Sequence, residues 1–262
     1  MTSGTVLKEF RPQDAIVPIV RWSDSLPIKQ LLGTGFFVGS GEKIHVVTAK
    51  HVFEGNPLLD GEKYAICLHG GKQIAVALIL QVRASLDFDL AVCKIPHEQL
   101  SGVLALPIAR SDAALTDDIF SYEYSQTRIV TTGRHTHVSF EPNAHKGNIV
   151  RSYESTWPEK IKTPSFLTSY PALQGASGAP VIAPTRGRKS FAVVGMLVAN
   201  VEQHLLPAQV FELREGEKYH EKTSYFLPYG KAIARPVVVQ SLEGMSVPFA
   251  FADEGDLSGT PT

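Results

Sequence analysis

The sequence predicts an all-β protein whose strands pack as sandwiches or barrels. Apolar runs of about 4 to 8 residues, rich in Val, Ile, Phe and Thr, recur along the chain. Each is bounded by Gly, Pro, Asn or Asp, which is the pattern of β-strands. No long helical pattern separates these runs, so the alternating strands and helices of a doubly wound sheet are not expected. The 21 Gly and 17 Pro agree with many turns.

Eleven segments carry the strand pattern, and their regular spacing is typical of barrels or sandwiches. In chain order they are 16–20, 35–38, 45–49, 65–68, 74–82, 90–95, 119–124, 136–140, 179–182, 191–198 and 224–227. A polar, Ala-rich stretch at 111–118 separates the sixth from the seventh and predicts a linker. A chain of 262 residues can hold one large or two small domains. We place one unit at 15–110 and the other at 119–240.

The segments outside the strand pattern also carry predictions. Residues 1–14 are expected to form an N-terminal extension, and 229–234 a short helix that Pro236 ends. Residues 201–223 are charged and show no alternation, which predicts a long loop. Gly, Pro, Ser, Thr and acidic residues dominate 241–262, which predicts a disordered tail.

Charge and hydropathy disfavour several classes of function. The chain has 25 Lys and Arg against 26 Asp and Glu, a net charge of −1, so nucleic acid is not an expected partner. No segment reaches the roughly 20 apolar residues that span a bilayer, and residues 1–9 lack the apolar stretch of a signal peptide. Cys67 and Cys93 are too few for a disulfide scaffold. We therefore expect a cytoplasmic protein with no membrane partner.

Three motifs place reactive side chains next to predicted strands. His51 follows an apolar strand that ends in Thr-Ala, Asp89 precedes a strongly apolar strand, and Ser177 lies in the run Gln-Gly-Ala-Ser-Gly-Ala-Pro-Val. A serine hydroxyl becomes a good nucleophile when a base takes its proton, and histidine suits that role near neutral pH. A buried carboxylate can hold the imidazole in the required tautomer, and glycines expose amides that can stabilise an oxyanion. Together the motifs predict nucleophilic catalysis.

Each motif alone also has a structural explanation. A single histidine after a strand is more often structural than catalytic, and Asp87 competes with Asp89 for the carboxylate role. Asp89 is preferred because it directly precedes the apolar strand, whereas Asp87 fits a turn. The GTGFFVG run at 33–39 superficially resembles a dinucleotide-binding loop. No helix follows it, so a strand with tight turns is the better interpretation.

The motifs in this order resemble the chymotrypsin-fold, trypsin-like serine peptidases, and among them the bacterial high-temperature-requirement proteases. The resemblance lies in GTGFFVG at 33–39, VVTAKH at 46–51, DFDLAV at 87–92, GASGAPV at 175–181 and SYFLP at 224–228. It covers roughly residues 15–235. The resemblance implies two six-stranded antiparallel β-barrels with an active site in the cleft between them.

The same resemblance implies a role for each residue of the three motifs. His51 would be the general base, Asp89 would orient it, and Ser177 would be the nucleophile of a serine endopeptidase that forms an acyl-enzyme. The backbone N–H groups of Gly175 and Ser177 would form the oxyanion hole. No metal or organic cofactor is needed, and the substrate would be a polypeptide. The alternative is a peptidase-like binding or scaffold protein that is inactive, or active only when a regulatory partner binds.

The residues expected around the substrate carry no charge. By the same resemblance the floor of the primary pocket lies about six residues before the nucleophile, at Pro171. Its walls would be Val198, Ala199, Asn200, Tyr225 and Phe226. This set predicts an apolar or small side chain before the cleaved bond. Ala176 and Ala179 depart from the commonest nucleophile motif of the family, in which an acidic or amide residue and a glycine stand there.

Other candidate features favour simpler explanations. His135 and His137 alternate on one strand, but no cysteine or carboxylate cluster accompanies them, so no metal site is predicted. The apolar patch at 248–251 could occupy the cleft as an internal regulator. Six further histidines are interpreted as surface or hydrogen-bonded polar positions: His45, His69, His97, His145, His204 and His220.

Overall fold

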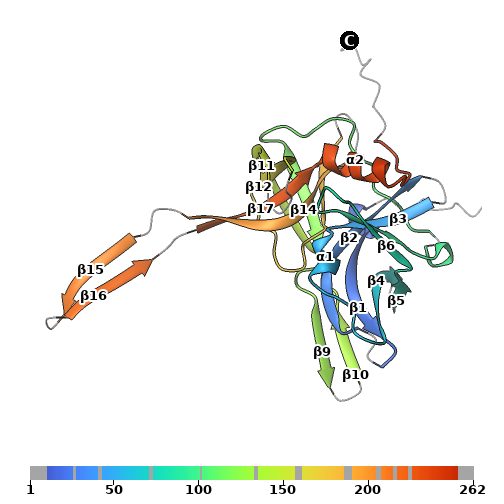
Figure 1. Ribbon diagram of the computed structural model, residues 1–262, viewed down its shortest axis with the longest axis horizontal. Coiled ribbons are helices and arrows are strands. Elements are labelled where there is room, and N and C mark those ends of the chain that lie inside the picture. The colour runs from blue at the N-terminus through green and yellow to red at the C-terminus, as the bar shows by residue number, and fades with distance from the viewer. Residues whose placement is uncertain are drawn as a thin grey trace, which may run out of the picture.

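The described residues form strands and two short α-helices, as the computed structural model shows (Figure 1). The structure describes residues 11–25, 28–40, 43–70, 73–100, 102–132, 135–156, 161–185, 191–204, 208–214, 217–223 and 226–252. Most of the expected N-terminal extension, Tyr225 and residues 253–262 of the expected tail lie outside these ranges. No helix in the described part is long and apolar enough to cross a membrane.

The N-terminal half is a strongly curved antiparallel sheet. Its strands lie in the order β5-β4-β1-β2-β3-β7-β6. The elements are the 3₁₀-helix Pro12–Ala15, β1 (Ile16–Ser23), β2 (Gln30–Ser40), β3 (Lys43–Thr48), α1 (His51–Glu54), β4 (Glu62–Gly70), β5 (Gln73–Leu78), β6 (Gln81–Ala84), β7 (Ala91–Lys94) and the 3₁₀-helix His97–Gln99. Every neighbouring pair is antiparallel.

The C-terminal half closes into a six-stranded barrel in the order β11-β12-β17-β14-β13-β8. The elements are β8 (Asp118–Glu123), β9 (Arg128–Thr132), β10 (His135–Ser139), β11 (Asn143–Ser155), β12 (Thr163–Thr168), β13 (Pro180–Pro184), β14 (Phe191–His204), β15 (Ala208–Arg214), β16 (Glu217–Thr223), β17 (Phe226–Ala234) and α2 (Arg235–Gly244). The β9–β10 and β15–β16 hairpins stand apart from the barrel wall, and β15–β16 extends farthest (Figure 1).

The prediction of an all-β, two-barrel fold is confirmed, and the two halves differ in how completely their sheets close. The C-terminal half is a closed barrel, whereas the N-terminal half is an open seven-stranded sheet of half-barrel shape. The halves share one apolar core. Phe36 and Val92 of the first half belong to the same cluster of buried side chains as Ile182 and Met196 of the second, together with Val238 of α2. Elements that end near this shared core are therefore held rigidly against each other.

Three expectations about the C-terminal third need correction. Residues 201–223 contain the end of β14 and the β15–β16 hairpin rather than a long loop. Backbone hydrogen bonds pair these strands, so a charged sequence does not prevent their formation. The helix lies at Arg235–Gly244 instead of 229–234, because Pro236 occupies its first turn, where proline is favoured, and so begins the helix that it was expected to end.

The third correction concerns the tail. Residues 241–244 belong to α2, and the segment that follows pairs with the chain at Ile108, near the end of the N-terminal unit. Ile108, three residues before the predicted linker, donates to the carbonyl of Ala250 at 2.8 Å and accepts from the amide of Ala252 at 2.8 Å. Val247 is buried in the shared core. The apolar patch at 248–251 therefore lies against the segment around Ile108, where apolar burial and backbone pairing hold it.

Candidate active site

His51 and Asp89 form the central polar contact of the N-terminal half. β3 and β7 pair in antiparallel fashion, with Thr48 opposite Ala91. The segment that follows Thr48 therefore lies beside the segment that precedes Ala91. The Nδ1 atom of His51 lies 2.7 Å from Oδ2 of Asp89. The backbone N–H of His51 donates to Oδ1 of Asp89 at 3.0 Å. One carboxylate therefore fixes both the ring and the backbone of His51.

The burial of the two side chains differs sharply. The side chain of Asp89 is 3% exposed, whereas that of His51 is 42% exposed. A buried carboxylate that accepts a hydrogen bond from the Nδ1–H group keeps the proton on Nδ1 and leaves the lone pair on Nε2, at the accessible side of the ring. Asp87, the competing carboxylate, is exposed in the turn before β7. The structure therefore brings Asp89 to His51 and leaves Asp87 at the surface.

Ser177 lies in a tight turn between two glycines with positive φ. Gly175 has φ +96° and Gly178 has φ +87°, conformations that residues with a Cβ rarely adopt. The amides of Ala176 and Gly178 are used inside the chain, bonding Leu173 O and Leu197 O. Among the described residues, the amides of Gly175 and Ser177 donate to no acceptor in the chain. These two N–H groups are the ones that the family resemblance predicts to form the oxyanion hole.

The Ser177 turn packs directly against the strand that leads to His51. A Cβ on Gly178 would overlap Thr48 Oγ1 and Thr34 O, and would lie 2.9 Å from Ala49 N. A Cβ on Gly33 would lie 2.9 Å from Ser177 O and 2.8 Å from Val52, the neighbour of His51. Glycines at these positions let the backbone of the C-terminal barrel approach β2 and β3 closely. The Ser177 turn, β3 and α1 consequently meet where the halves join.

The expected pocket residues are only partly brought together. Pro171 follows Tyr170, whose carbonyl accepts hydrogen bonds from the Gly230 amide at 2.7 Å and from Thr168 Oγ1 at 2.6 Å. Asn200 pairs with Gly230 across β14 and β17. Pro171 is therefore connected through Tyr170 and Gly230 to the wall that contains Val198, Ala199 and Asn200.

Phe226 does not lie beside that wall. It pairs with His204, four positions along the strand from the Asn200–Gly230 pair, which is about 13 Å at the usual rise per residue. The register makes Gly230 the neighbour of Asn200, and sequence reasoning missed it. No local signal could have found it, because the register depends on the length of the intervening β15–β16 hairpin.

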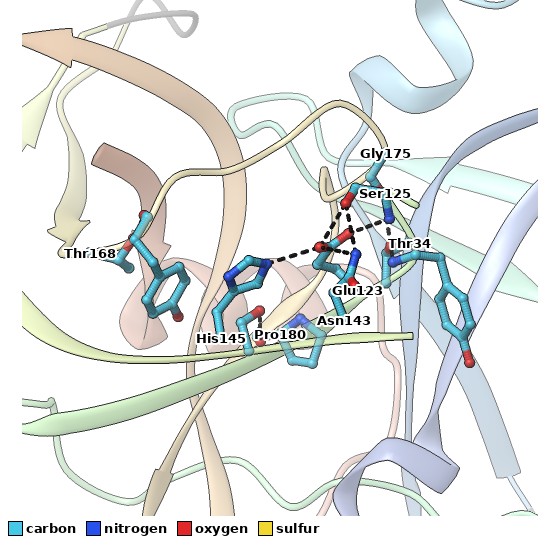
Figure 2. A network of polar contacts seen from close by, with 11 residues as sticks. Thr34, Glu123, Ser125, Asn143, His145, Thr168, Gly175 and Pro180 are labelled. Carbon is cyan, nitrogen blue, oxygen red and sulfur yellow. Dashed lines mark hydrogen bonds and ion pairs between the residues drawn. The ribbon is translucent and has the colours of Figure 1, made fainter. Parts of the chain in front are cut away.

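A second polar cluster lies inside the C-terminal barrel, close to Gly175. Glu123 is 0% exposed. Its carboxylate accepts hydrogen bonds from the amide and hydroxyl of Ser125, from Asn143 Nδ2 at 3.2 Å and from His145 Nε2 at 3.0 Å. Figure 2 shows these groups converging on Glu123, with Thr34 and Gly175 alongside. Burial alone would raise the pKa of Glu123, and the hydrogen bonds outweigh burial and hold the pKa below its ordinary value.

Sequence reasoning treated His145 as a polar position and did not single out Glu123. The only available signal was the two-residue alternation in the strands that contain them, which is too general to identify a buried cluster. No group of three or more His, Cys, Asp or Glu side chains suited to hold a metal ion occurs among the described residues. The side chain of His135 is not among them.

Residues 33–196 match the sequence profile of the trypsin-like peptidase domain. The match covers more than half of the chain and includes the His51, Asp89 and Ser177 motifs. The chain belongs to the trypsin-like peptidase family. It is accordingly a hydrolase of the serine peptidase class.

Solved structures of peptidases share the fold of this trypsin-like peptidase. The active form of the Rv3671c protease from M. tuberculosis superposes with a TM-score of 0.55 at 16% identity, over 92% of this chain and 85% of the other. Neuropsin, a serine protease of mouse brain, superposes with a TM-score of 0.54 at 13% identity, over 91% of this chain and 97% of the other. At such low identity the likeness concerns the fold. No curated protein sequence matches the chain.

Proposed function

We propose that the protein is a serine endopeptidase in which His51, Asp89 and Ser177 act as the catalytic triad. The observation that carries this proposal is the contact of 2.7 Å between His51 Nδ1 and buried Asp89, next to the turn that contains Ser177. That contact would leave Nε2 of His51 to accept a proton. The two unbonded amides of the turn, at Gly175 and Ser177, provide donors for a developing oxyanion.

The proposed reaction has two halves. Ser177 Oγ attacks the carbonyl carbon of a peptide bond while His51 Nε2 takes the hydroxyl proton. The amides of Gly175 and Ser177 donate to the carbonyl oxygen as it becomes negative. His51 then gives the proton to the leaving amine, and the C–N bond breaks to leave an acyl ester on Ser177. Water attacks this ester with His51 again as the base, which releases the carboxylic acid and restores the Ser177 hydroxyl.

The proposal includes a preference for an apolar or small side chain before the cleaved bond. Pro171, Val198 and Ala199 carry no charge, and Gly230, which the register places beside them, adds none. A peptide library should therefore be cleaved mainly after uncharged residues. A profile dominated by Arg or Lys would contradict this part of the proposal and leave the triad unaffected.

Labelling with a fluorophosphonate probe tests the nucleophile. The wild-type chain should be labelled, and Ser177→Ala should not be. Ser165→Ala is a matched control, because Ser165 is buried in the same barrel and its hydroxyl bonds Thr163 O at 3.0 Å. Persistent labelling of Ser177→Ala would contradict the assignment. Absence of labelling both with and without a cell lysate would favour a binding protein.

Asp87 and Asp89 provide a second matched pair. Asp89→Asn should lower kcat/KM by about 10⁴-fold, because an amide next to Nδ1 favours the wrong imidazole tautomer. Asp87→Asn should change kcat/KM by less than about two-fold, since Asp87 is exposed in the adjoining turn. Equal effects of the two substitutions would sink the role proposed for Asp89.

A further inference from the structure

Glu123 and its partners lie on the inner face of two paired strands. Antiparallel pairing sets Asn143 of β11 opposite Glu123 of β8, and His145 opposite Ser121. Alternate residues of a strand share a face, so these side chains project into the barrel together. A buried carboxylate is costly unless donors surround it. Glu123 meets this cost with hydrogen bonds from Ser125, Asn143 and His145.

This arrangement fixes the chain that leaves β8. Both the amide and the hydroxyl of Ser125 donate to Glu123. The preceding amide, that of Tyr124, donates to Thr34 Oγ1 at 3.2 Å. Ser125 is therefore fixed by Glu123 of its own barrel, and Tyr124 is fixed by Thr34 on β2 of the other half.

The fixed segment lies directly against Gly175. A Cβ on Gly175 would lie 3.2 Å from Ser125 Cα, so the two backbones are in contact. Thr34 Oγ1, which accepts from Tyr124, donates in turn to the carbonyl of Gly175 at 2.7 Å. Moving Ser125 and the adjoining Tyr124 would therefore remove the packing against Gly175. It would also disturb Thr34 Oγ1, which donates to the Gly175 carbonyl.

The other side of the cluster reaches the expected pocket. The ring of His145 stacks on Tyr170, with centroids 5.4 Å apart and an interplanar angle of 17°. Tyr170 immediately precedes Pro171. Glu123 therefore contacts both Ser125, which packs against Gly175, and His145, which stacks on Tyr170 next to the expected pocket floor.

We propose that Glu123 is a positioning residue, which aligns the amides of Gly175 and Ser177 by holding Ser125 against Gly175. The inference rests on the proposed function, since it assigns these amides to the oxyanion. Glu123 touches no reacting atom. Its loss should therefore act on kcat, because oxyanion donors act in the transition state, and should leave KM nearly unchanged.

Glu123→Gln tests the proposal with little change in shape. The Glu123 Oε1 atom receives Ser125 Oγ, Asn143 and His145, and Oε2 receives the Ser125 amide. Whichever way a glutamine amide is turned, its NH₂ group faces at least one of these donors. We expect kcat to fall about 10- to 100-fold, because misplacement by about 1 Å is enough for such a loss, with KM within about three-fold of wild type.

Glu62→Gln is the matched control. Glu62 is also buried and accepts from a backbone amide, that of Leu59, and from Lys29. Its polar contacts within the described residues are with Lys29, Leu59 and Arg21, away from the Gly175 turn. Glu62→Gln should lower the melting temperature by a similar amount and leave kcat within about two-fold. Unchanged kcat in Glu123→Gln, or an equal loss of kcat in both variants, would overturn the positioning role.

Hydrogen exchange separates this inference from the proposed function, because it requires no turnover. Peptides that span 173–179 contain the bonded amides of Ala176, Gly178 and Ala179. Their exchange should be faster in Glu123→Gln than in wild type and in Glu62→Gln. Unchanged exchange overturns the positioning role even if the enzyme is active. Faster exchange supports that role even if wild-type labelling fails and the triad is rejected.

A second variant covers the case in which Glu123→Gln fails to fold. Glu123→Asp keeps the charge and shortens the side chain by one methylene. It should give an intermediate loss of kcat and an intermediate increase in exchange of the 173–179 peptides. Wild-type values of both quantities would overturn the proposal.

Discussion

The amide of Thr34 donates a hydrogen bond to the carbonyl oxygen of Ser177 at 2.9 Å. Thr34 lies on β2 of the N-terminal half, and Ser177 lies in the turn before β13 of the C-terminal barrel. The Thr34 hydroxyl bonds the carbonyl of Gly175, and the Thr34 carbonyl accepts from Thr48 Oγ1 at 2.7 Å. A single residue therefore holds the Ser177 turn and the end of β3, the strand that leads to His51. Neither half holds this arrangement alone.

Thr34→Val should reduce activity more than stability. Valine keeps the shape and the backbone hydrogen bond, but it loses the hydroxyl that bonds Gly175 O and accepts from Tyr124 N. We expect a loss of about 1–2 kcal/mol in the free energy of unfolding and a fall in kcat of about 10-fold or more.

Thr163→Val is the comparison for this measurement. Thr163 is equally buried, and its hydroxyl bonds a carbonyl, that of Ile161, at 3.2 Å. It should lose similar stability with little change in kcat. Steady-state kinetics and thermal melts of both variants distinguish the two effects. If kcat falls equally in both, Thr34 has no special relation to the site.

Gly178→Ala should abolish activity through close packing rather than through backbone strain. The added Cβ would overlap Thr48 Oγ1 and Thr34 O, which forces the halves apart. Gly61 also has a positive φ, +77°, but a Cβ there meets nothing within 4 Å. Gly61→Ala should therefore cost only about 1–2 kcal/mol in unfolding free energy and keep full activity. Similar activity losses in the two variants, measured where both are folded, would contradict this reasoning.

The features that the sequence predicts correctly are those that depend on residues close together in the chain. Strands of the core are continuous apolar runs. His51 follows one such run, and Asp89 directly precedes another. Because β3 and β7 are neighbours, the ends of those runs meet, and Asp89 reaches His51. The glycine-rich turn at Ser177 is equally local, since positive φ at Gly175 and Gly178 favours glycine.

The parts that were missed depend on relations between distant segments. The register of β14 with β17 sets Gly230, and not Phe226, opposite Asn200, and this follows from a hairpin whose length has no sequence signature. Pro236 was interpreted as a helix end because proline both ends helices and begins them. Glu123 was not found because its partners, Ser125, Asn143 and His145, come together only when the barrel closes.

The contribution of Glu123 to stability should depend on pH. Its pKa is lower in the folded protein than the ordinary value of 4.5. Its stabilisation is therefore present above that ordinary value and is lost as the pH falls through the lower, folded value. The melting temperature of wild type should exceed that of Glu123→Gln by a constant margin above pH of about 5, and the margin should shrink below about 4.5, since glutamine does not titrate.

Two controls define this pH experiment. Glu98 is exposed, so Glu98→Gln should show almost no margin at any pH. His145 is the titratable group that faces Glu123, so the same melts with His145→Gln in both backgrounds show whether the margin belongs to the carboxylate. A margin that stays constant down to pH of about 3 would mean that Glu123 contributes through shape alone.

A chain that ends after Gly244 should be less stable but equally active. It loses the burial of Val247, the hydrogen bond of 2.8 Å from Arg83 to Met245 O, and the two backbone bonds of Ile108 to Ala250 and Ala252. Burial of one valine contributes about 1.5–3 kcal/mol. A protein of this size loses about 2–4 °C in melting temperature per kcal/mol, so we expect a drop of at least about 5 °C. A chain that ends after Ala252 is the comparison, because it keeps all of these contacts, and the drop is measured against it.

The same truncation should leave activity unchanged. Because residues 250–252 lie against Ile108, kcat and KM measured at a temperature where all chains are folded should stay the same. A rise in activity or a lower KM after truncation would mean that the 248–251 patch competes with substrate, contrary to its position in the structure.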